Sequence, residues 1–191
     1  EEKLKDVFLP PTIAQLSEMI EGESKAQQVW LQPVEEQDHY DVTHAQKRLW
    51  ILYQIEEKTA YNETNAYIIN GKLDLQGFEL AFCEVVGRHE ALRTRIVDVK
   101  GAPRQKVSPF VAETYKIQIV DLSTEASTDQ RVKSMIKAET SLPFDLASDD
   151  LFRIKVIKLG DQKHMVVFTI HHIISDDLSM QVLNHELLTA Y

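Results

Sequence analysis

Apolar residues recur at helical spacing in four stretches of the chain, and each stretch predicts an amphipathic helix. The stretches are residues 43–56, 78–89, 128–140 and 179–191. Thr43 and Ser179 stand at the start of two of them, where N-cap residues belong, and Pro143 follows the end of the third. The residues between these stretches then belong to strands, turns and loops.

Alternation of apolar and polar residues, or a short apolar run, predicts strands between the helices. The predicted strands are residues 66–73, 94–99, 105–107, 115–120, 151–159 and 164–170. Lys100-Gly101 and Gly160-Asp161 separate neighbouring strands and predict two hairpins. Helices that interleave with hairpins in this way predict an α/β fold, an α+β sandwich in which helices pack on a mixed β-sheet.

The first forty residues differ from the rest of the chain. Apolar residues at helical spacing follow Thr12, a candidate N-cap. From residue 21 to 38 the sequence is polar, rich in Glu and Gln, and contains Gly22 and Pro33, which is typical of a linker. The chain begins without methionine and ends within a helical pattern, so we expect it to be part of a longer protein.

Composition and charge narrow the class of protein. The 191 residues suffice for one domain, and 43% apolar with 27% charged residues is the balance of a globular protein. A formal net charge of −9 disfavours a nucleic-acid partner. The start of the chain does not have the pattern of a signal peptide, and no apolar run is long enough to cross a membrane. Cys83 is the single cysteine, so we expect a reduced, cytoplasmic protein with no membrane partner.

The segment richest in candidate chemistry is His171-His172-Ile173-Ile174-Ser175-Asp176-Asp177-Leu178-Ser179, directly after the apolar run 165–170. Adjacent residues on a strand point to opposite faces, so one histidine can face a cavity while the other packs behind it. Histidine is also suited to proton transfer near neutral pH. A metal site built from His171, His172 and Asp176 is the alternative, and it is disfavoured because the side chains of adjacent strand residues diverge.

Three blocks of the sequence resemble the core motifs of nonribosomal peptide synthetase condensation domains. The first block is Thr43-His44-Ala45-Gln46-Lys47-Arg48-Leu49-Trp50-Ile51-Leu52, similar to the family's S-x-A-Q-x-R-L-W-x-L. The second is Arg88-His89-Glu90-Ala91-Leu92-Arg93-Thr94-Arg95-Ile96, similar to R-H-E-x-L-R-T-x-F, and the third is the segment 171–179, similar to H-H-x-x-x-D-G-x-S. Pro143-Phe144-Asp145-Leu146 resembles the family's P-F-D-L landmark. The blocks come in the family's order, and the resemblance covers residues 39–191.

The resemblance implies a chloramphenicol-acetyltransferase-like fold, of which residues 39–191 would form the first of two lobes, with the second lobe absent. Residues 1–22 are similar to the C-terminal helix of a peptidyl carrier protein, which leaves 23–38 as the linker. The implied reaction joins a donor aminoacyl or peptidyl thioester to the amine of an acceptor aminoacyl thioester. The phosphopantetheine arms of upstream and downstream carrier proteins would deliver both substrates, an adenylation domain would lie nearby, and no cofactor would bind the chain itself.

The resemblance also implies roles for individual residues. His172 would face the tunnel between the lobes, orient the acceptor amine and take its proton, with His171 and Asp176 completing the implied catalytic set. From the positions of the residues, we expect Arg93 to bridge Asp176 and hold the active-site loop, with Arg88 as the competing partner. Because the implied reaction centre lies between two lobes, we expect the isolated lobe to be inactive.

One position departs from the family's pattern: Asp177 stands where the family has glycine, two residues before the matching Ser179. A carboxylate there adds bulk and negative charge next to His172. This departure keeps open a non-catalytic alternative, a platform that docks carrier proteins. An epimerisation relative is a second alternative, although that family favours tryptophan where Met180 follows the serine. A heterocyclisation relative is rejected because it replaces the two histidines with aspartates, and a free acyl-CoA transferase would not explain the carrier-like start.

Overall fold

The computed structural model describes residues 12, 14, 32, 34–125 and 128–191. The chain divides into two units, residues 1–36 and residues 37–191, and the fold below is that of the second unit. Most of the expected carrier-protein helix at 1–22 and most of the linker at 23–38 lie outside the described residues. Those two assignments therefore stay predictions.

The larger of two sheets has four strands in the order β2-β7-β6-β5. Their bounds are Asn62–Asn70, Lys163–His171, Phe152–Gly160 and Gln118–Asp121. β7 pairs antiparallel with both β2 and β6, whereas β5 pairs parallel with β6, so the sheet is mixed as predicted. The hairpin around Gly160-Asp161 connects β6 to β7, and it puts the histidine pair at the far end of β7.

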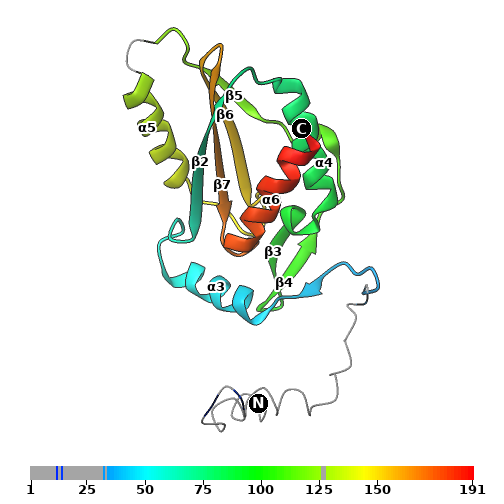
Figure 1. The fold of residues 1–191 in the computed structure, drawn as a ribbon. Coiled ribbons are helices and arrows are strands. Elements are labelled where there is room, and N and C mark those ends of the chain that lie inside the picture. Colours follow the sequence, from blue (N-terminus) through cyan, green and yellow to red (C-terminus); the bar gives the residue numbers. More distant parts are fainter. Residues whose placement is uncertain (1–11, 13, 15–31, 33, 126–127) are drawn as a thin grey trace. The chain divides into compact units, whose positions relative to one another are not determined.

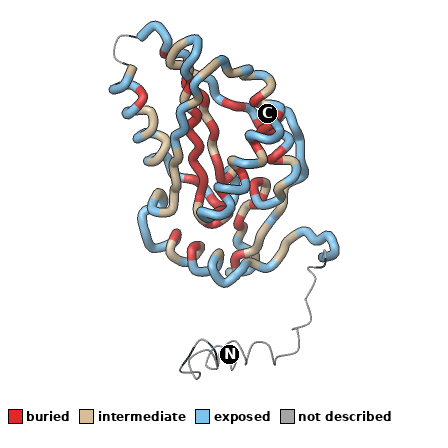
Figure 2. The backbone as a smooth tube through the Cα atoms, viewed as in Figure 1, coloured by how far each residue is buried: buried red, intermediate tan, exposed pale blue. Residues whose placement is uncertain are grey.

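Helices cover both faces of this sheet (Figure 1). α4 (Leu75–Arg88) and α6 (Asp177–Ala190) lie on one face, and α5 (Thr128–Thr140) lies on the other. Alternate residues of β6 explain the two layers, because Phe152, Ile154 and Val156 pack with α4 and α6 while Ile157 packs with α5. Figure 2 shows the buried positions concentrated along the central strands.

The smaller sheet has three antiparallel strands in the order β1-β4-β3. Their bounds are Tyr40–Asp41, Ala102–Val107 and Thr94–Val99. Lys100 and Gly101 both have positive φ, 57° and 81°, as a two-residue type I′ hairpin turn requires. Short 3₁₀ helices precede β3 and β5, at Glu90–Arg93 (η1) and Ala112–Thr114 (η2).

A separate apolar cluster lies where α3 (His44–Ile55) meets the end of β7. Its buried members are Leu49, Tyr53, Ile96, Phe144, Leu146, Leu151 and Ile173. Thr43 caps α3 as predicted, and its hydroxyl accepts from the Gln46 N–H while the Gln46 side chain accepts from the Thr43 N–H. The cluster brings the first motif block and the Pro-Phe-Asp-Leu segment to the histidine loop.

Several predicted boundaries are wrong: the strand predicted at 105–107 is β4, which starts at Ala102, and the helix predicted at 78–89 is α4, which starts at Leu75. Two further boundaries are wrong for a clear local reason. The strand predicted at 66–73 is β2, which starts at Asn62 and ends at Asn70 because Gly71 has φ of +122°. The strand predicted at 115–120 begins only at Gln118, because the Ile117 N–H donates to the Glu79 carboxylate of α4 and not to a neighbouring strand. Among the described residues, no helix combines the length and the apolar character that crossing a membrane requires.

Candidate active site

His171 ends strand β7 and is completely buried. Its ring lies among three aromatic side chains, with centroid distances of 6.2 Å to Tyr53, 6.4 Å to Tyr61 and 6.3 Å to Phe144. Burial, and secondarily the neighbouring His172, lowers the pKa of His171 from 6.5 to about 4. The ring is therefore neutral near neutral pH.

The hydrogen bonds of His171 fix its tautomer. Its Nδ1 accepts from the Ile173 N–H at 3.1 Å, so the proton of the neutral ring belongs on Nε2. Nε2 is buried and has no hydrogen-bond partner among the described residues. The backbone N–H of His171 donates to the Leu151 carbonyl at 2.9 Å. The ring thus holds the turn that follows the strand, a placement that suits a structural residue.

His172 has the opposite environment. Its side chain is 40% exposed, and its backbone N–H donates to the Tyr61 carbonyl at 2.9 Å, which extends the β2–β7 ladder by one residue. Nδ1 is buried and lies 2.6 Å from Oε1 of Glu63, within ion-pair distance. The carboxylate lies off the direction of a hydrogen bond from Nδ1, so the contact is primarily electrostatic.

Glu63 is the site residue that sequence reasoning missed. It is the second residue of β2 and pairs with Ile170, while Asn62 pairs with His171. A residue lies on the same face of the sheet as its direct partner on the next strand and as the residue two positions from that partner. Since Glu63 pairs with Ile170, it lies diagonally beside His172. The β2–β7 register is the signal that could have found it, and β2 is far from the motif in sequence.

Asp176 starts helix α6 and is its N-cap. Its Oδ1 accepts from the Ser179 N–H at 2.8 Å and from the Ser179 hydroxyl at 2.6 Å. The Ser179 hydroxyl bond, the Ser179 N–H bond and the charge of His172, in that order, lower the pKa of Asp176. The prediction that Ser179 caps this helix is wrong, because Asp176 is the residue in extended conformation whose carboxylate reaches the free N–H groups. Asp177 is the first helical residue and is exposed.

The predicted bridge between Arg93 and Asp176 is also wrong. The guanidinium of Arg93 donates to three backbone carbonyls, those of Val86, Gly87 and Ser108. Two of these carbonyls belong to the last turn of α4, where a helix presents free acceptors and favours a cation. Arg93 therefore ties α4 to the segment after β4, and Ser179 already occupies the carboxylate of Asp176.

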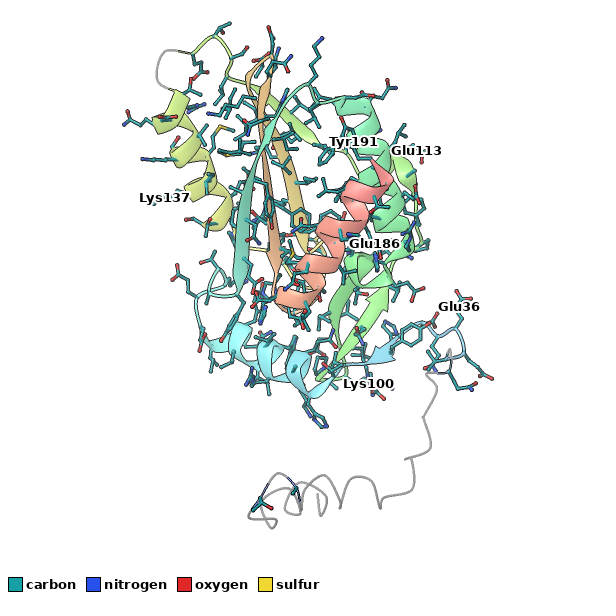
Figure 3. The ribbon with its side chains drawn as sticks, viewed as in Figure 1. Glu36, Lys100, Glu113, Lys137, Glu186 and Tyr191 are labelled. Carbon is teal, nitrogen blue, oxygen red and sulfur yellow. The ribbon has the colours of Figure 1, made fainter. Side chains whose placement is uncertain are left out.

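Arg88, the other expected partner, belongs to an ion-pair group between α4 and α6. It contacts Glu84 at 2.7 Å and Glu186 at 2.9 Å, and His89 Nε2 lies 2.9 Å from the same Glu186 oxygen. Glu186, labelled on α6 in Figure 3, has its pKa lowered first by His89 and then by Arg88. These residues hold the two helices that cover one face of the sheet.

Gln46 connects the first motif block to the histidine loop. Its Nε2 donates to the Ile173 carbonyl at 3.3 Å and to the Gln105 side chain at 3.1 Å. On the other side of the loop, a cavity of about 400 Å³ lies between η1 and the start of α6. Its lining is mainly apolar and includes Leu92, Ile174, Met180 and the buried Ser175, whose hydroxyl has no partner among the described residues.

The described residues contain no group of three or more His, Cys, Asp and Glu side chains placed to hold a metal ion. His171 Nδ1 and the Asp176 carboxylate, two donors of the alternative metal set, already accept hydrogen bonds from Ile173 and Ser179. What the arrangement offers chemically is one accessible imidazole beside a carboxylate, at the end of a rigid strand and before a capped helix. Such a group can take up and release a proton.

Comparison with known proteins gives a family. The family model described as "Condensation domain" matches residues 36–191. The chain is 38% identical over 190 residues to gramicidin S synthase 2 of Brevibacillus brevis and 39% identical over 189 residues to tyrocidine synthase 3 of Brevibacillus parabrevis. Each alignment covers 98% of this chain, but only 4% and 3% of those much longer proteins.

Solved structures give the same fold. The first condensation domain of the calcium-dependent antibiotic synthetase superimposes with a TM-score of 0.75 at 22% identity, covering 80% of this chain and 39% of that chain. The starter condensation domain of the rhizomide synthetase gives a TM-score of 0.74 at 21% identity, covering 80% of this chain and 38% of that chain. At this level of identity the likeness concerns the fold, the chloramphenicol-acetyltransferase-like architecture that the motifs imply.

Proposed function

The chain belongs to the condensation-domain family of nonribosomal peptide synthetases, and we propose that in its parent protein it takes part in forming peptide bonds. The acceptor amine attacks the carbonyl carbon of the donor thioester, and a C–N bond forms as the C–S bond breaks. The proton that leaves the amine ends on the sulfur of the departing thiol.

The observation that carries this proposal is the placement of His172. It is the accessible member of the histidine pair, its Nδ1 edge is buried against Glu63, and the rest of the ring is left for a substrate. An α-amine has a pKa of about 8, so a positioned imidazole needs only to orient the amine and accept its proton during attack. His172 serves as that acceptor and later returns the proton to the leaving sulfur.

Membership of the family supports our proposal for the substrates and partners. Donor and acceptor arrive on the phosphopantetheine arms of upstream and downstream carrier proteins, and an adenylation domain loads the acceptor. Residues 39–191 form the first lobe of the domain, a second lobe completes the reaction centre, and residues 1–22 and 23–38 are a carrier helix and a linker. The parent works in the cytoplasm, and the isolated chain is inactive.

A second candidate function is a platform that docks carriers without catalysis. The observation that favours it is Asp177, an exposed carboxylate in the first turn of α6 where the family has glycine. Negative charge or bulk at that position disturbs a substrate that approaches His172.

The test uses the parent synthetase module with loaded donor and acceptor carriers. Peptide formation is followed for the wild type, His172→Ala and Asp177→Gly. If the wild type forms peptide and the His172→Ala variant does not, the catalytic proposal is supported. A silent wild type that Asp177→Gly activates supports the docking platform, and full activity of His172→Ala refutes the role given to His172.

A further inference from the structure

Glu63 is placed to act on His172 from a strand that none of the three motif blocks includes. Its Oε1 lies 2.6 Å from His172 Nδ1, and the two side chains are 32% and 40% exposed. The hydrogen bond from the His172 N–H to the Tyr61 carbonyl continues the β2–β7 ladder to the last residue before the loop. The pair therefore sits on a rigid sheet edge.

The Glu63 carboxylate has no competing cation. Within the described part of the chain it makes no ion pair with a lysine or an arginine, and the basic group in contact with it is the His172 imidazole. Two other carboxylates nearby have partners: Asp176 accepts twice from Ser179, and Glu186 contacts Arg88 and His89. Asp177 is exposed in the first turn of α6, and no ion pair joins it to the His172 ring. A carboxylate that is not neutralised elsewhere stabilises an adjacent imidazolium most strongly.

We infer that Glu63 is a positioning residue for His172. Its carboxylate lies against the Nδ1 edge of the ring and leaves Nε2 on the accessible side of the side chain. When Nε2 takes the proton of the attacking amine, the ring gains a positive charge and Glu63 balances it. When that proton passes to the leaving sulfur, the ring returns to neutral, so no further reactant is needed. This inference rests on the proposed peptide-bond-forming function.

Besides the exposed Asp177, the titratable groups nearest to His172 among the described residues are Glu63, Asp176 and His171, and their charges separate the effect of Glu63 from that of its neighbours. Glu63 contacts the ring from β2, Asp176 interacts with it from the start of α6, and His171 precedes it on β7. His171 is neutral above about pH 4, and the carboxylate of Asp176 is anionic throughout the neutral range. Only removal of Glu63 therefore changes the charge in direct contact with the ring.

The test measures single-turnover peptide formation by the parent synthetase with loaded carriers. We expect Glu63→Gln to lower the rate constant at saturating acceptor about tenfold or more, with the acceptor KM unchanged, a fraction of what a positioned base contributes. Glu63→Asp restores part of the rate. Glu57→Gln, which removes the same charge from an exposed loop, changes nothing.

The His172→Ala background separates this inference from the function on which it rests. If Glu63 acts through His172, adding Glu63→Gln to His172→Ala has no further effect. If His172→Ala loses peptide formation while Glu63→Gln keeps the same rate as Glu57→Gln, the inference is overturned and the proposed function stands. A fully active His172→Ala overturns both. If Glu63→Gln lowers the folded yield, the rate of Glu63→Asp, whose shorter side chain withdraws the charge from Nδ1, decides in its place, and a rate equal to that of the wild type overturns the inference.

Discussion

The surroundings of His171 are aromatic and closed, whereas those of His172, one residue later, are polar and open. The first ring is fully buried among Tyr53, Tyr61 and Phe144, and the second is 40% exposed beside Glu63. Alternation along a strand produces this division, since successive side chains point to opposite faces. Two identical side chains thereby acquire different tasks, one that holds the backbone and one that is available to a substrate.

Truncating the two histidines should give the largest difference in stability. His171→Ala removes a fully buried ring and leaves a cavity, so we expect a loss of about 3 kcal/mol in the free energy of unfolding. His172→Ala removes a partly exposed ring and should change stability by about 0.5 kcal/mol or less. Denaturant unfolding of both variants measures the difference, and equal losses would mean that the closed and open surroundings are not distinct.

Acidification should destabilise the protein through the closed site. The folded pKa of His171 is about 4 against 6.5 unfolded, so between these values the unfolded chain binds the extra proton. The stability that the neutral His171 ring gives to the folded protein is fully present above pH 6.5. It is lost as the pH falls toward 4, and the loss amounts to about 3 kcal/mol. Carboxyl groups with lowered pKa, such as Glu79 and Asp176, act only below their ordinary values of 4.5 and 3.8.

The control for that prediction is His171→Phe, which keeps an aromatic ring in the aromatic pocket. Unfolding curves recorded between pH 6.5 and 4.5 should show a declining stability in the wild type and a flatter one in His171→Phe. Parallel curves would show that His171 is not the group responsible.

Helix α6 and the end of α4 provide a second, smaller contrast, because Asp176 and Arg93 stabilise separate places. Asp176→Ala removes an N-cap and should lower stability by about 1 kcal/mol. Since Arg93 donates to carbonyls and not to Asp176, the effects of Arg93→Ala and Asp176→Ala should add within about 0.5 kcal/mol. A double-mutant cycle measures this, and a clear coupling energy would restore the bridge that the sequence alone suggested.

The smallest effect is expected at Asp177. Its carboxylate lies in the first turn of α6, where negative charge stabilises a helix by about 0.3–1 kcal/mol at low salt. Asp177→Gly should therefore lower the melting temperature slightly, and added salt should shrink the difference from the wild type. A large loss of stability would indicate that Asp177 has a structural partner.

Periodicity in the sequence predicted the elements well where one residue pattern decided the structure. The helices α3, α4 and α5, the hairpin at Lys100-Gly101 and the mixed sheet were found from spacing and turn residues alone. The predicted boundary of a strand was wrong where a tertiary contact replaced strand pairing, as at Ile117, whose N–H donates to a side chain of α4. The motifs located the histidine pair, and strand alternation correctly predicted that one ring would be buried.

The partners of the site could not be predicted because they depend on register and on competition. Glu63 reaches His172 only through the pairing of β2 with β7, which no local pattern encodes. The expected partners of Asp176 were Arg93 and Arg88, but the structure gives Ser179, because a helix N-terminus presents its N–H groups at hydrogen-bond distance without ordering a long side chain.

The most direct measurement is single-turnover peptide formation by the parent synthetase carrying either His172→Gln or His171→Phe, with rates corrected for the folded fraction. If His172 is the reactive residue and His171 the structural one, the rate of His172→Gln is about a hundredfold or more below that of the wild type. The same assignment predicts that His171→Phe loses less than about tenfold, since its ring never meets the substrate. A His172→Gln enzyme that retains its rate while folded His171→Phe loses it would contradict the account.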